Sequence, residues 1–314
     1  MKIIFFGTPD FAAHILADLV RAKIDVLAVV TKPDKPQGRS AKLIPPPVRQ
    51  IAHSLLPSIP VYQPEKCSTP EFAAILRTLP ADLYVVVAYG EIMRQDILDI
   101  PSHGCVNVHA SLLPAYRGAA PIQRCLMNGE SESGISIIRL VRKMDAGDIV
   151  CMEKIPIDEN MTAPELESKL CALGSQLIQK VIVDIESGNA CYTEQDHAKA
   201  TFADKIVPEE CAIDWKKPAR DIHNLVRAVT PHPGAFCYVS LRGERKRMKV
   251  LRSQLHIAEN FLPASLHLIQ KSKLLVGCGV GALQVLELQV EGKPVMKAED
   301  FLRGILVSDI SFFI

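Results

Sequence analysis

Short apolar runs alternate with amphipathic stretches through the first half of this 314-residue chain, and this alternation limits the fold more than any other feature. The runs have the composition of buried strands, and the stretches between them carry apolar residues at helical spacing. Strands that alternate with helices form a mostly parallel, doubly wound sheet. We therefore predict an α/β fold. The expected strands are Lys2–Phe6, Asp25–Thr31, Asp82–Ala88, Cys105–His109, Ile135–Val141 and Ile149–Ile155.

Residues typical of helix caps locate the helices between these strands. Thr8 precedes Pro9, an order that suits a cap followed by the first helical residue. Two Ser/Thr-x-x-Glu capping boxes follow, and the second opens a long amphipathic stretch that continues to Ile185. The boxes are Ser68 with Glu71 and Thr162 with Glu165.

The pattern changes after Gly188. Residues 189–204 are polar and without clear period, which indicates a linker, and short β-type segments separated by turns follow. The chain thus divides into residues 1–188, a linker of residues 189–204 and a small C-terminal β-barrel or sandwich of residues 205–314. Its expected strands are Ala235–Val239, Met248–Leu251, Leu274–Val276 and Leu283–Leu286, with helices over Pro218–Ala228 and Ala298–Leu302.

The net charge of +1 hides an uneven distribution. Residues 1–204 carry 20 Lys and Arg against 24 Asp and Glu, a net charge of −4, whereas residues 205–314 carry 16 against 11, a net charge of +5. This asymmetry falls where the structural pattern changes, and it allows a polyanionic partner such as a nucleic acid without requiring one.

Composition and absent signals exclude several classes of protein. With 48% hydrophobic and 23% charged residues the chain has the composition of a globular protein. No apolar run approaches the roughly 18 residues of a membrane span, and no signal peptide is evident, so we expect a cytoplasmic protein. The nine cysteines form no Cys-x-x-Cys pair, which removes support for a zinc ribbon and favours reduced, mostly packed thiols.

Two polar side chains, Asn107 and His109, alternate with Val106 and Val108 in one expected strand. Alternation in a strand places the polar pair on one face, where it can meet a ligand at the carboxyl end of a parallel strand. The alternative is that Asn107 caps a turn and that His109 is a satisfied buried histidine. Context from the rest of the chain has to decide between them.

A carboxylate in the segment Met144-Asp-Ala-Gly-Asp148 could complete such a site. For Asp148 an Asx-turn is the better interpretation. Asp145 becomes informative beside Asn107 and His109, because an amide, an imidazole and a carboxylate can together polarise a carbonyl, stabilise an oxyanion and move a proton. That trio suits acyl transfer without a metal.

A basic segment, Lys32-Pro-Asp-Lys-Pro-Gln-Gly-Arg-Ser-Ala-Lys42, follows the second expected strand. Its Pro and Gly content excludes a helix and predicts a loop. A charge run is usually a solvated surface, but a long loop without secondary structure is uncommon in a compact domain unless it binds something or is disordered. Phosphates are the obvious partner for the four cations of this segment.

Several catalytic fingerprints are missing. Gly7-Thr-Pro-Asp-Phe11 follows the first strand, but it lacks the GxGxxG glycines, which disfavours a nicotinamide dinucleotide. Neither a P-loop nor HExxH nor Gly-x-Ser-x-Gly occurs.

Taken together, these motifs resemble the methionyl-tRNA formyltransferase family over essentially the whole length. The resemblance rests on Gly7-Thr-Pro-Asp-Phe11, Lys32-Pro-Asp-Lys-Pro-Gln-Gly-Arg39, Val86-Val-Ala-Tyr-Gly90, Asn107-Val-His-Ala-Ser-Leu-Leu-Pro114, Tyr116-Arg-Gly-Ala-Ala-Pro-Ile-Gln123 and Met144-Asp-Ala-Gly-Asp148. Ala110 is a small departure, since many relatives are expected to have Gly there.

The resemblance implies a Rossmann-like formyltransferase domain and a C-terminal OB-like barrel that helps to hold tRNA. It implies that 10-formyltetrahydrofolate donates a formyl group to methionyl initiator tRNA, with no metal, and that the protein is a monomer. The family's catalytic residues fall on Asn107, His109 and Asp145. The folate pocket is expected at Tyr89, Gly90, Ser111, Leu112, Leu113 and Pro114, and tRNA contacts at Lys35, Arg39 and Lys42.

Other functions fit part of this pattern. Formyltransferases that act on an amino-sugar nucleotide or on glycinamide ribonucleotide share the Asn-x-His and Asp residues, but the basic segment and the Gly-Thr-Pro-Asp-Phe turn argue against both. An RNA-binding module on an inactive scaffold is a further alternative, and the presence of all three polar residues argues against it.

Overall fold

The computed structural model describes residues 1–37, 42–256, 261–270, 272–305 and 309–313, which form two compact units. Unit 1 comprises residues 1–121, 132–155 and 167–203, and unit 2 comprises residues 122–131, 156–166 and 204–314. Short parts of the first half of the chain therefore belong to unit 2.

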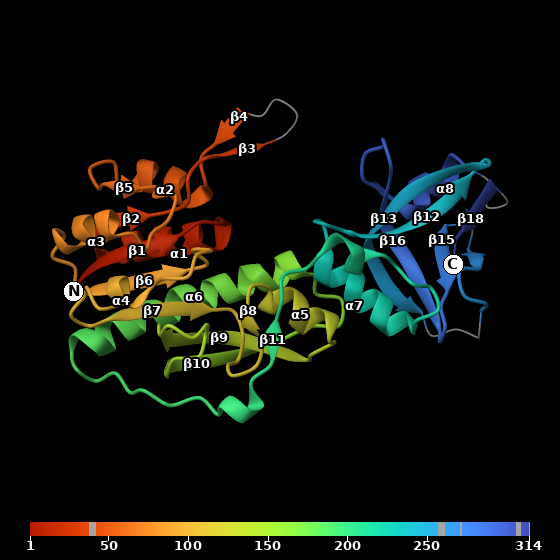
Figure 1. The fold of residues 1–314 in the computed structure, drawn as a ribbon. Coiled ribbons are helices and arrows are strands. Elements are labelled where there is room, and N and C mark those ends of the chain that lie inside the picture. The colour runs from red at the N-terminus through yellow and green to blue at the C-terminus, as the bar shows by residue number, and fades with distance from the viewer. Residues whose placement is uncertain (38–41, 257–260, 271, 306–308, 314) are drawn as a thin grey trace. The chain divides into compact units, whose positions relative to one another are not determined.

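Unit 1 is built on a seven-stranded sheet of order β10-β9-β7-β6-β1-β2-β5 (Figure 1). Parallel pairs join β1 to β2 and β6, β2 to β5 and β6 to β7, whereas β9 runs antiparallel to β7. All six predicted strands are present, and the doubly wound α/β prediction is confirmed. The strands are β1 (Lys2–Gly7), β2 (Asp25–Val30), β5 (Val61–Tyr62), β6 (Leu83–Val87), β7 (Cys105–His109), β9 (Glu132–Arg139) and β10 (Ile149–Pro156).

Helices cover both faces of this sheet. On one face, side chains of β1, β2 and β6 share a core cluster with residues of α3 and α4, and Cys105 of β7 belongs to it. On the other face, a Cβ built on Gly174 of α6 would lie 3.2 Å from Val108 and 3.3 Å from Ile15 of α1. The helices of the first half are α1 (Asp10–Arg21), α2 (Pro47–Leu55), α3 (Pro70–Arg77), α4 (Gln95–Leu98), α5 (Pro121–Met127) and α6 (Ala163–Glu186).

Two of the three predicted caps are wrong. Helix α1 is capped at Pro9 without a side-chain hydrogen bond, and the Thr8 hydroxyl donates instead to the carbonyl oxygen of Tyr89, 2.9 Å away. At α3 it is Thr69, next to Ser68, that accepts from a backbone N–H. The third prediction is supported, because a Glu165 carboxylate oxygen accepts from the Thr162 N–H at 2.8 Å.

The basic segment expected to be an irregular loop is in part a β-ribbon, so that expectation is wrong. β3 (Lys35–Gln37) pairs antiparallel with β4 (Lys42–Ile44). The base of the ribbon is fixed by Asp34, whose carboxylate accepts from Arg49 at 2.5 Å and from Gln63 at 2.8 Å. Strands of three residues are too short to show a period in the sequence, which explains why the pattern predicts a loop.

Residues 189–203 belong to unit 1. Thr193 forms a β-bridge with Ile149, and β11 (Phe202–Ala203) pairs in parallel with β8 (Arg117–Gly118). Between them lies a 3-10 helix, η1 (His197–Lys199). The segment expected as a linker therefore lies against the strands and loops of unit 1.

Unit 2 contains an antiparallel sheet of order β14-β15-β16-β13-β12-β18, with β17 paired to β16. The four predicted strands and two predicted helices are present, and the OB-like C-terminal β domain is confirmed. Trp215 is fully buried in its core and meets Phe312 edge to face. The elements are η2 (Pro208–Cys211), α7 (Ala219–Val229), β12 (Ala235–Leu241), β13 (Glu244–His256), β14 (Leu266–Ile269), β15 (Lys273–Gly277), β16 (Ala282–Val290), β17 (Met296–Lys297), α8 (Ala298–Arg303) and β18 (Ile310–Phe312).

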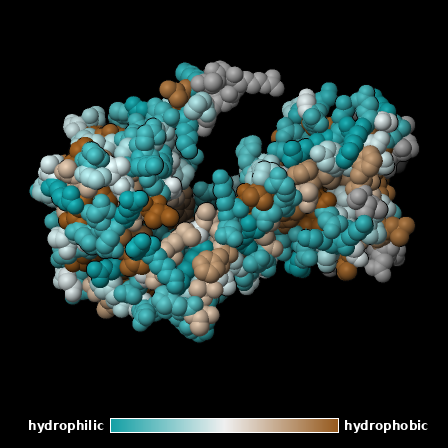
Figure 2. Space-filling view, in the orientation of Figure 1, coloured by the Kyte–Doolittle hydropathy of each residue, from teal (hydrophilic) through white to brown (hydrophobic). Residues whose placement is uncertain are grey.

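The surface and the interior are those expected for a chain with the composition of a globular protein. On the side seen in Figure 2, hydrophobic residues occur in small groups among hydrophilic ones. All nine cysteines are free, and all except Cys151 and Cys191 are buried, as predicted. Within the part of the chain that the structure describes, no helix is both long and apolar enough to cross a membrane.

Candidate active site

Strand β7 places Asn107 and His109 at its carboxyl-terminal half. Its residues pair with β6 on one side, Asn107 opposite Val86, and with β9 on the other, His109 opposite Ser136. By strand alternation both side chains lie on the face of Cys105, opposite the valines. His109 is 5% exposed and Asn107 is half-buried. Among the described residues no hydrogen-bond partner is found for the Asn107 amide, so it is available to a ligand.

His109 is held from two sides. Its Nε2 lies 2.9 Å from the carbonyl oxygen of Tyr116, and its Nδ1 lies 3.7 Å from a carboxylate oxygen of Asp145. A carbonyl oxygen can only accept, so Nε2 carries a proton. In the neutral ring Nδ1 is then an acceptor that faces a carboxylate, and a second proton on Nδ1 makes this contact favourable. The Asp145 carboxylate thus lies opposite the ring nitrogen that the Tyr116 carbonyl leaves free.

The loop between β9 and β10 fixes Asp145. Its carboxylate accepts from the N–H of Gly118 at 2.9 Å, and its backbone has φ +49, in the left-handed region. Two residues later Gly147 packs tightly, since a Cβ there would lie 1.8 Å from the carbonyl oxygen of Arg139. The conformation of this loop is therefore closely determined by its surroundings. The three predicted catalytic residues come from one strand, β7, and one loop of unit 1.

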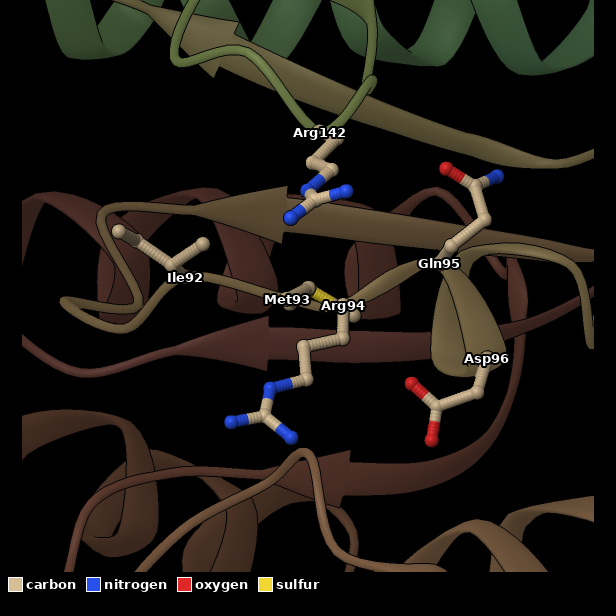
Figure 3. A pocket seen from close by; sticks show the side chains of 6 residues that line it. All are labelled: Ile92, Met93, Arg94, Gln95, Asp96 and Arg142. Carbon is tan, nitrogen blue, oxygen red and sulfur yellow. The ribbon is translucent and has the colours of Figure 1, made fainter.

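A pocket of about 530 Å³ opens in the same unit. It is lined by Ile92, Met93, Arg94, Gln95 and Asp96, which follow β6, and by Arg142. Figure 3 shows Arg142 reaching from the β9–β10 loop toward the segment that carries the other five. The loop that carries Asp145 therefore also forms one wall of the pocket.

The residues predicted for folate are not among those that line this pocket, although Tyr89 and Gly90 shortly precede its lining segment in the sequence. Tyr89 is 2% exposed, packs edge to face on Phe6, and has its pKa raised by burial; Gly90 is exposed. Ser111 and Leu113 are buried, and the Ser111 hydroxyl donates to the carbonyl oxygen of Ala115. Leu112 and Pro114 are partly exposed.

The structure describes two of the three residues that are predicted to contact tRNA. Lys35 and Lys42 are exposed on β3 and β4 of the ribbon. Arg39 lies outside the described residues. Two cations of the ribbon are thus presented to solvent.

Sequence reasoning missed the pocket residues and two buried polar side chains, Arg117 and Gln195. Arg117 is 1% exposed and Gln195 is 4% exposed, and they are hydrogen-bonded to each other. Arg117 lies in the Tyr-Arg-Gly motif, which was a usable signal, whereas nothing around Gln195 distinguishes it from other polar residues of the linker. No group of three or more His, Cys, Asp or Glu that could hold a metal ion occurs among the residues described.

Two family models match the chain. The formyl transferase model matches residues 1–182, and the model of the formyl transferase C-terminal domain matches residues 205–306. Solved structures share the fold. A sugar 3N-formyl transferase, WlaRD, crystallised in the presence of dTDP and 5-N-formyl-THF, has a TM-score of 0.67 at 18% identity over 94% of this chain and 99% of its own. HypX from Aquifex aeolicus in complex with tetrahydrofolic acid has a TM-score of 0.65 at 14% identity over 96% of this chain and 47% of its own.

Curated relatives named methionyl-tRNA formyltransferase are much more similar. The one from Geobacter metallireducens (strain ATCC 53774 / DSM 7210 / GS-15) is 44% identical over 304 residues, which cover 97% of this chain and 96% of the relative. The one from Protochlamydia amoebophila (strain UWE25) is 45% identical over 314 residues, which cover 100% and 98%. Identity of this degree along the entire chain places the protein in the methionyl-tRNA formyltransferase family.

Proposed function

We propose that the protein transfers the formyl group of 10-formyltetrahydrofolate to the α-amino group of methionyl initiator tRNA, a step that prepares the tRNA for translation initiation. The observation that carries this proposal is the contact of Asp145 with His109, at 3.7 Å, because His109 lies on the strand that also presents Asn107, whose amide has no hydrogen-bond partner among the described residues. The names of the full-length relatives support the choice of tRNA as acceptor.

In this reaction the α-amine nitrogen bonds to the formyl carbon, the bond from that carbon to N10 breaks, and the proton lost by the amine ends on N10. The products are formylmethionyl-tRNA and tetrahydrofolate. The Asn107 amide donates to the formyl oxygen, on which negative charge develops. Protonated His109 adds positive charge beside that oxygen, and Asp145 balances this charge and accepts the proton of the amine, directly or through water.

The pocket beyond β6 fits the folate. Its volume of about 530 Å³ lies in the range of small-molecule sites, and it combines the apolar side chains of Ile92 and Met93 with polar groups. It begins two residues after Gly90, and Arg142 on its wall lies three residues before Asp145. We propose that the loops at Tyr89, Gly90 and Ser111–Pro114 also border the folate site. Bound folate supplies an electrophilic formyl carbon, and the pocket would orient it toward β7.

The ribbon and unit 2 are the proposed tRNA contacts. Lys35 and Lys42 would pair with phosphates, and Arg39 would reach the acceptor end. We propose residues 1–188 as the formyltransferase domain, residues 189–204 as the linker and residues 205–314 as a second tRNA-binding domain, with the whole acting as a monomer. Because charged tRNA is cytoplasmic, the reaction would take place there.

The direct test is formylation with purified protein and 10-formyltetrahydrofolate. Three acceptors are compared, namely methionyl initiator tRNA, an amino-sugar nucleotide and glycinamide ribonucleotide. We expect product only with the tRNA, and a strongly lowered but measurable kcat in Asp145→Asn. Transfer to either small acceptor but not to tRNA would overturn the proposal.

The ribbon is tested with the double variant Lys35→Ala and Lys42→Ala. We expect KM for tRNA to rise roughly 10-fold at 0.15 M salt, with a smaller dependence of KM on salt, because two phosphate contacts are lost. The control, Lys66→Ala with Lys180→Ala, removes the same charge from two exposed positions of unit 1. An equal effect of both pairs would show that only net charge matters.

A further inference from the structure

Gln195 is a buried amide with four hydrogen bonds, two of which join the linker to the β9–β10 loop and two to Arg117 of β8. Its Nε2 lies 2.9 Å from the carbonyl oxygen of Asp145 and 2.6 Å from that of Gly147. Its Oε1 accepts from Nε and from one terminal nitrogen of Arg117, at 3.1 and 2.6 Å. All these residues belong to unit 1.

The chemistry of the partners fixes the orientation of this amide. The two carbonyl oxygens can only accept, so they require the NH₂ group, and the guanidinium can only donate, so it requires the oxygen. A flipped amide would place like groups together on both sides. Gln195 therefore has one satisfied orientation, and Arg117 selects it.

The loop that Gln195 holds is the one that aims Asp145. Asp145 has a left-handed backbone, a conformation that is uncommon for residues other than glycine and that contacts around the loop help to hold. The amide of Gln195 binds the carbonyl of Asp145 itself and of Gly147, on both sides of Ala146. With the loop held in this way, the Asp145 carboxylate reaches the Gly118 N–H and faces His109.

Strand β8 acts on both ends of this arrangement. Gly118 donates to the Asp145 carboxylate, and its neighbour Arg117 donates to the amide that holds the Asp145 backbone. Arg117 also contacts Nδ1 of His197 at 2.9 Å, so a second residue of the linker steadies the guanidinium. Carboxylate and backbone of Asp145 are thus positioned from one short strand.

We propose that Gln195 is a positioning residue of the formyl transfer, acting through Asp145, and that Arg117 acts by orienting Gln195. This inference rests on the proposed function of Asp145. It gives the linker a part in catalysis, because Gln195 belongs to the linker and acts through Asp145. Gln195 itself needs no contact with either substrate.

The sharpest single change is Gln195→Glu. The side chain keeps its size and its acceptor for Arg117, but the two donors to the loop are replaced by a carboxylate oxygen that repels both carbonyls. We expect kcat to fall roughly 10- to 100-fold while KM for tRNA and for folate changes less than about 3-fold, since small displacements of a catalytic group have effects of this size. The control Glu194→Gln makes the reverse exchange at the exposed neighbouring position and should leave kcat unchanged.

A double-mutant cycle separates positioning from a general loss of structure. If Gln195 acts through Asp145, adding Gln195→Ala to Asp145→Asn should lower kcat less than about 3-fold further, although Gln195→Ala alone lowers it more than 10-fold. If the reductions in kcat caused by the two single substitutions multiply in the double variant, the proposal is overturned. Wild-type kcat in both Gln195→Glu and Gln195→Ala would overturn it as well.

A readout that needs no acceptor distinguishes this inference from the proposed function. The ¹⁵N shifts of the His109 ring, assigned by comparison with His109→Asn, should change in Gln195→Glu and stay constant in Glu194→Gln. Unchanged His109 shifts in Gln195→Glu would refute the positioning role whatever the acceptor is. Failure of wild-type protein to formylate tRNA would refute only the proposed function.

Discussion

Two buried histidines, one in each unit, differ in a single neighbour. His109 of unit 1 is 5% exposed and His223 of unit 2 is 2% exposed. In both, Nε2 contacts a backbone carbonyl oxygen, that of Tyr116 at 2.9 Å and that of Glu159 at 3.0 Å. The other ring nitrogen of His223 lies 2.9 Å from the hydroxyl of Ser253, whereas that of His109 faces the carboxylate of Asp145.

We interpret this difference as the one between a structural histidine and the proposed catalytic one. With its Nε2 protonated, His223 accepts the Ser253 hydroxyl hydrogen at Nδ1, so both nitrogens are satisfied in the neutral ring. Burial lowers its pKa, and the nearby Arg227 and Arg220 act in the same direction. At His109 the second ring nitrogen faces a carboxylate oxygen, which cannot donate a hydrogen bond as the Ser253 hydroxyl does. Burial and a carbonyl partner are therefore common to both histidines, and the group at the second ring nitrogen is what distinguishes the proposed catalytic one.

The largest expected effect is on kcat of the His109→Asn variant. Loss of the positive charge near the formyl oxygen, together with the ring that faces the Asp145 carboxylate, should lower kcat about 10³-fold. The melting temperature should stay close to that of the wild type. A kcat within 10-fold of the wild type would remove His109 from the catalytic group.

His223→Leu should have the opposite profile. It leaves the carbonyl of Glu159 and the hydroxyl of Ser253 buried without their partner, and we expect the free energy of unfolding to fall by about 2 kcal/mol. Urea unfolding gives this value, and kcat per folded molecule should not change. A large loss of kcat in folded protein would show that the two histidines are not functionally distinct.

Ser253→Asp would make the surroundings of His223 like those of His109. A carboxylate at Nδ1 favours the imidazolium, so the pKa of His223 should rise by roughly one to two units. An NMR titration of the His223 ring measures the change, and Ser253→Asn, which adds bulk without charge, is the control. An equal rise in both variants would show that the carboxylate is not the cause.

The smallest expected effect is on the pH dependence of stability. The pKa of His223 is lower in the folded protein than in the unfolded chain, so the unfolded chain binds the proton more readily. The stability that this histidine contributes is therefore fully present above its unfolded pKa and is lost as the pH falls toward its folded pKa. Between pH 7 and pH 5 this histidine should contribute a decrease on the order of 1 kcal/mol. The difference between wild type and His223→Leu in unfolding experiments isolates it, and parallel pH profiles would contradict it.

The sequence predicts those parts of the molecule that have a local period. Strands β1, β2, β6 and β7 are apolar runs buried in the sheet, and the alternation in β7 is enough to place Asn107 and His109 together. The residues that cap the helices were less predictable, because neighbouring Ser and Thr residues can each act as the N-cap of the same helix. Thr8 is drawn to the carbonyl of Tyr89 by a contact 81 residues away in sequence, and Thr69 caps α3 in place of Ser68.

The parts of the candidate site that could not be predicted depend on distant contacts. Gln195 is 50 residues from Asp145 and 78 from Arg117, and in the sequence it lies in a polar stretch without a motif. The pocket residues Ile92–Asp96 form no pattern of their own, and they line a pocket only because Arg142 lies across from them. Such residues are identified by what approaches them in space.

The return of the chain along β8 also limits how this enzyme can be taken apart or recombined. The backbone of Thr201 accepts from the N–H of Arg117, and its hydroxyl accepts from that of Tyr116, whose carbonyl binds His109. A fragment cut after Gly188, where the long helix ends, would lose these contacts together with Gln195. A chimaera that joins the N-terminal part of this chain to a different C-terminal domain should therefore place its junction beyond Ala203, so that the proposed active site keeps the segment that contacts it.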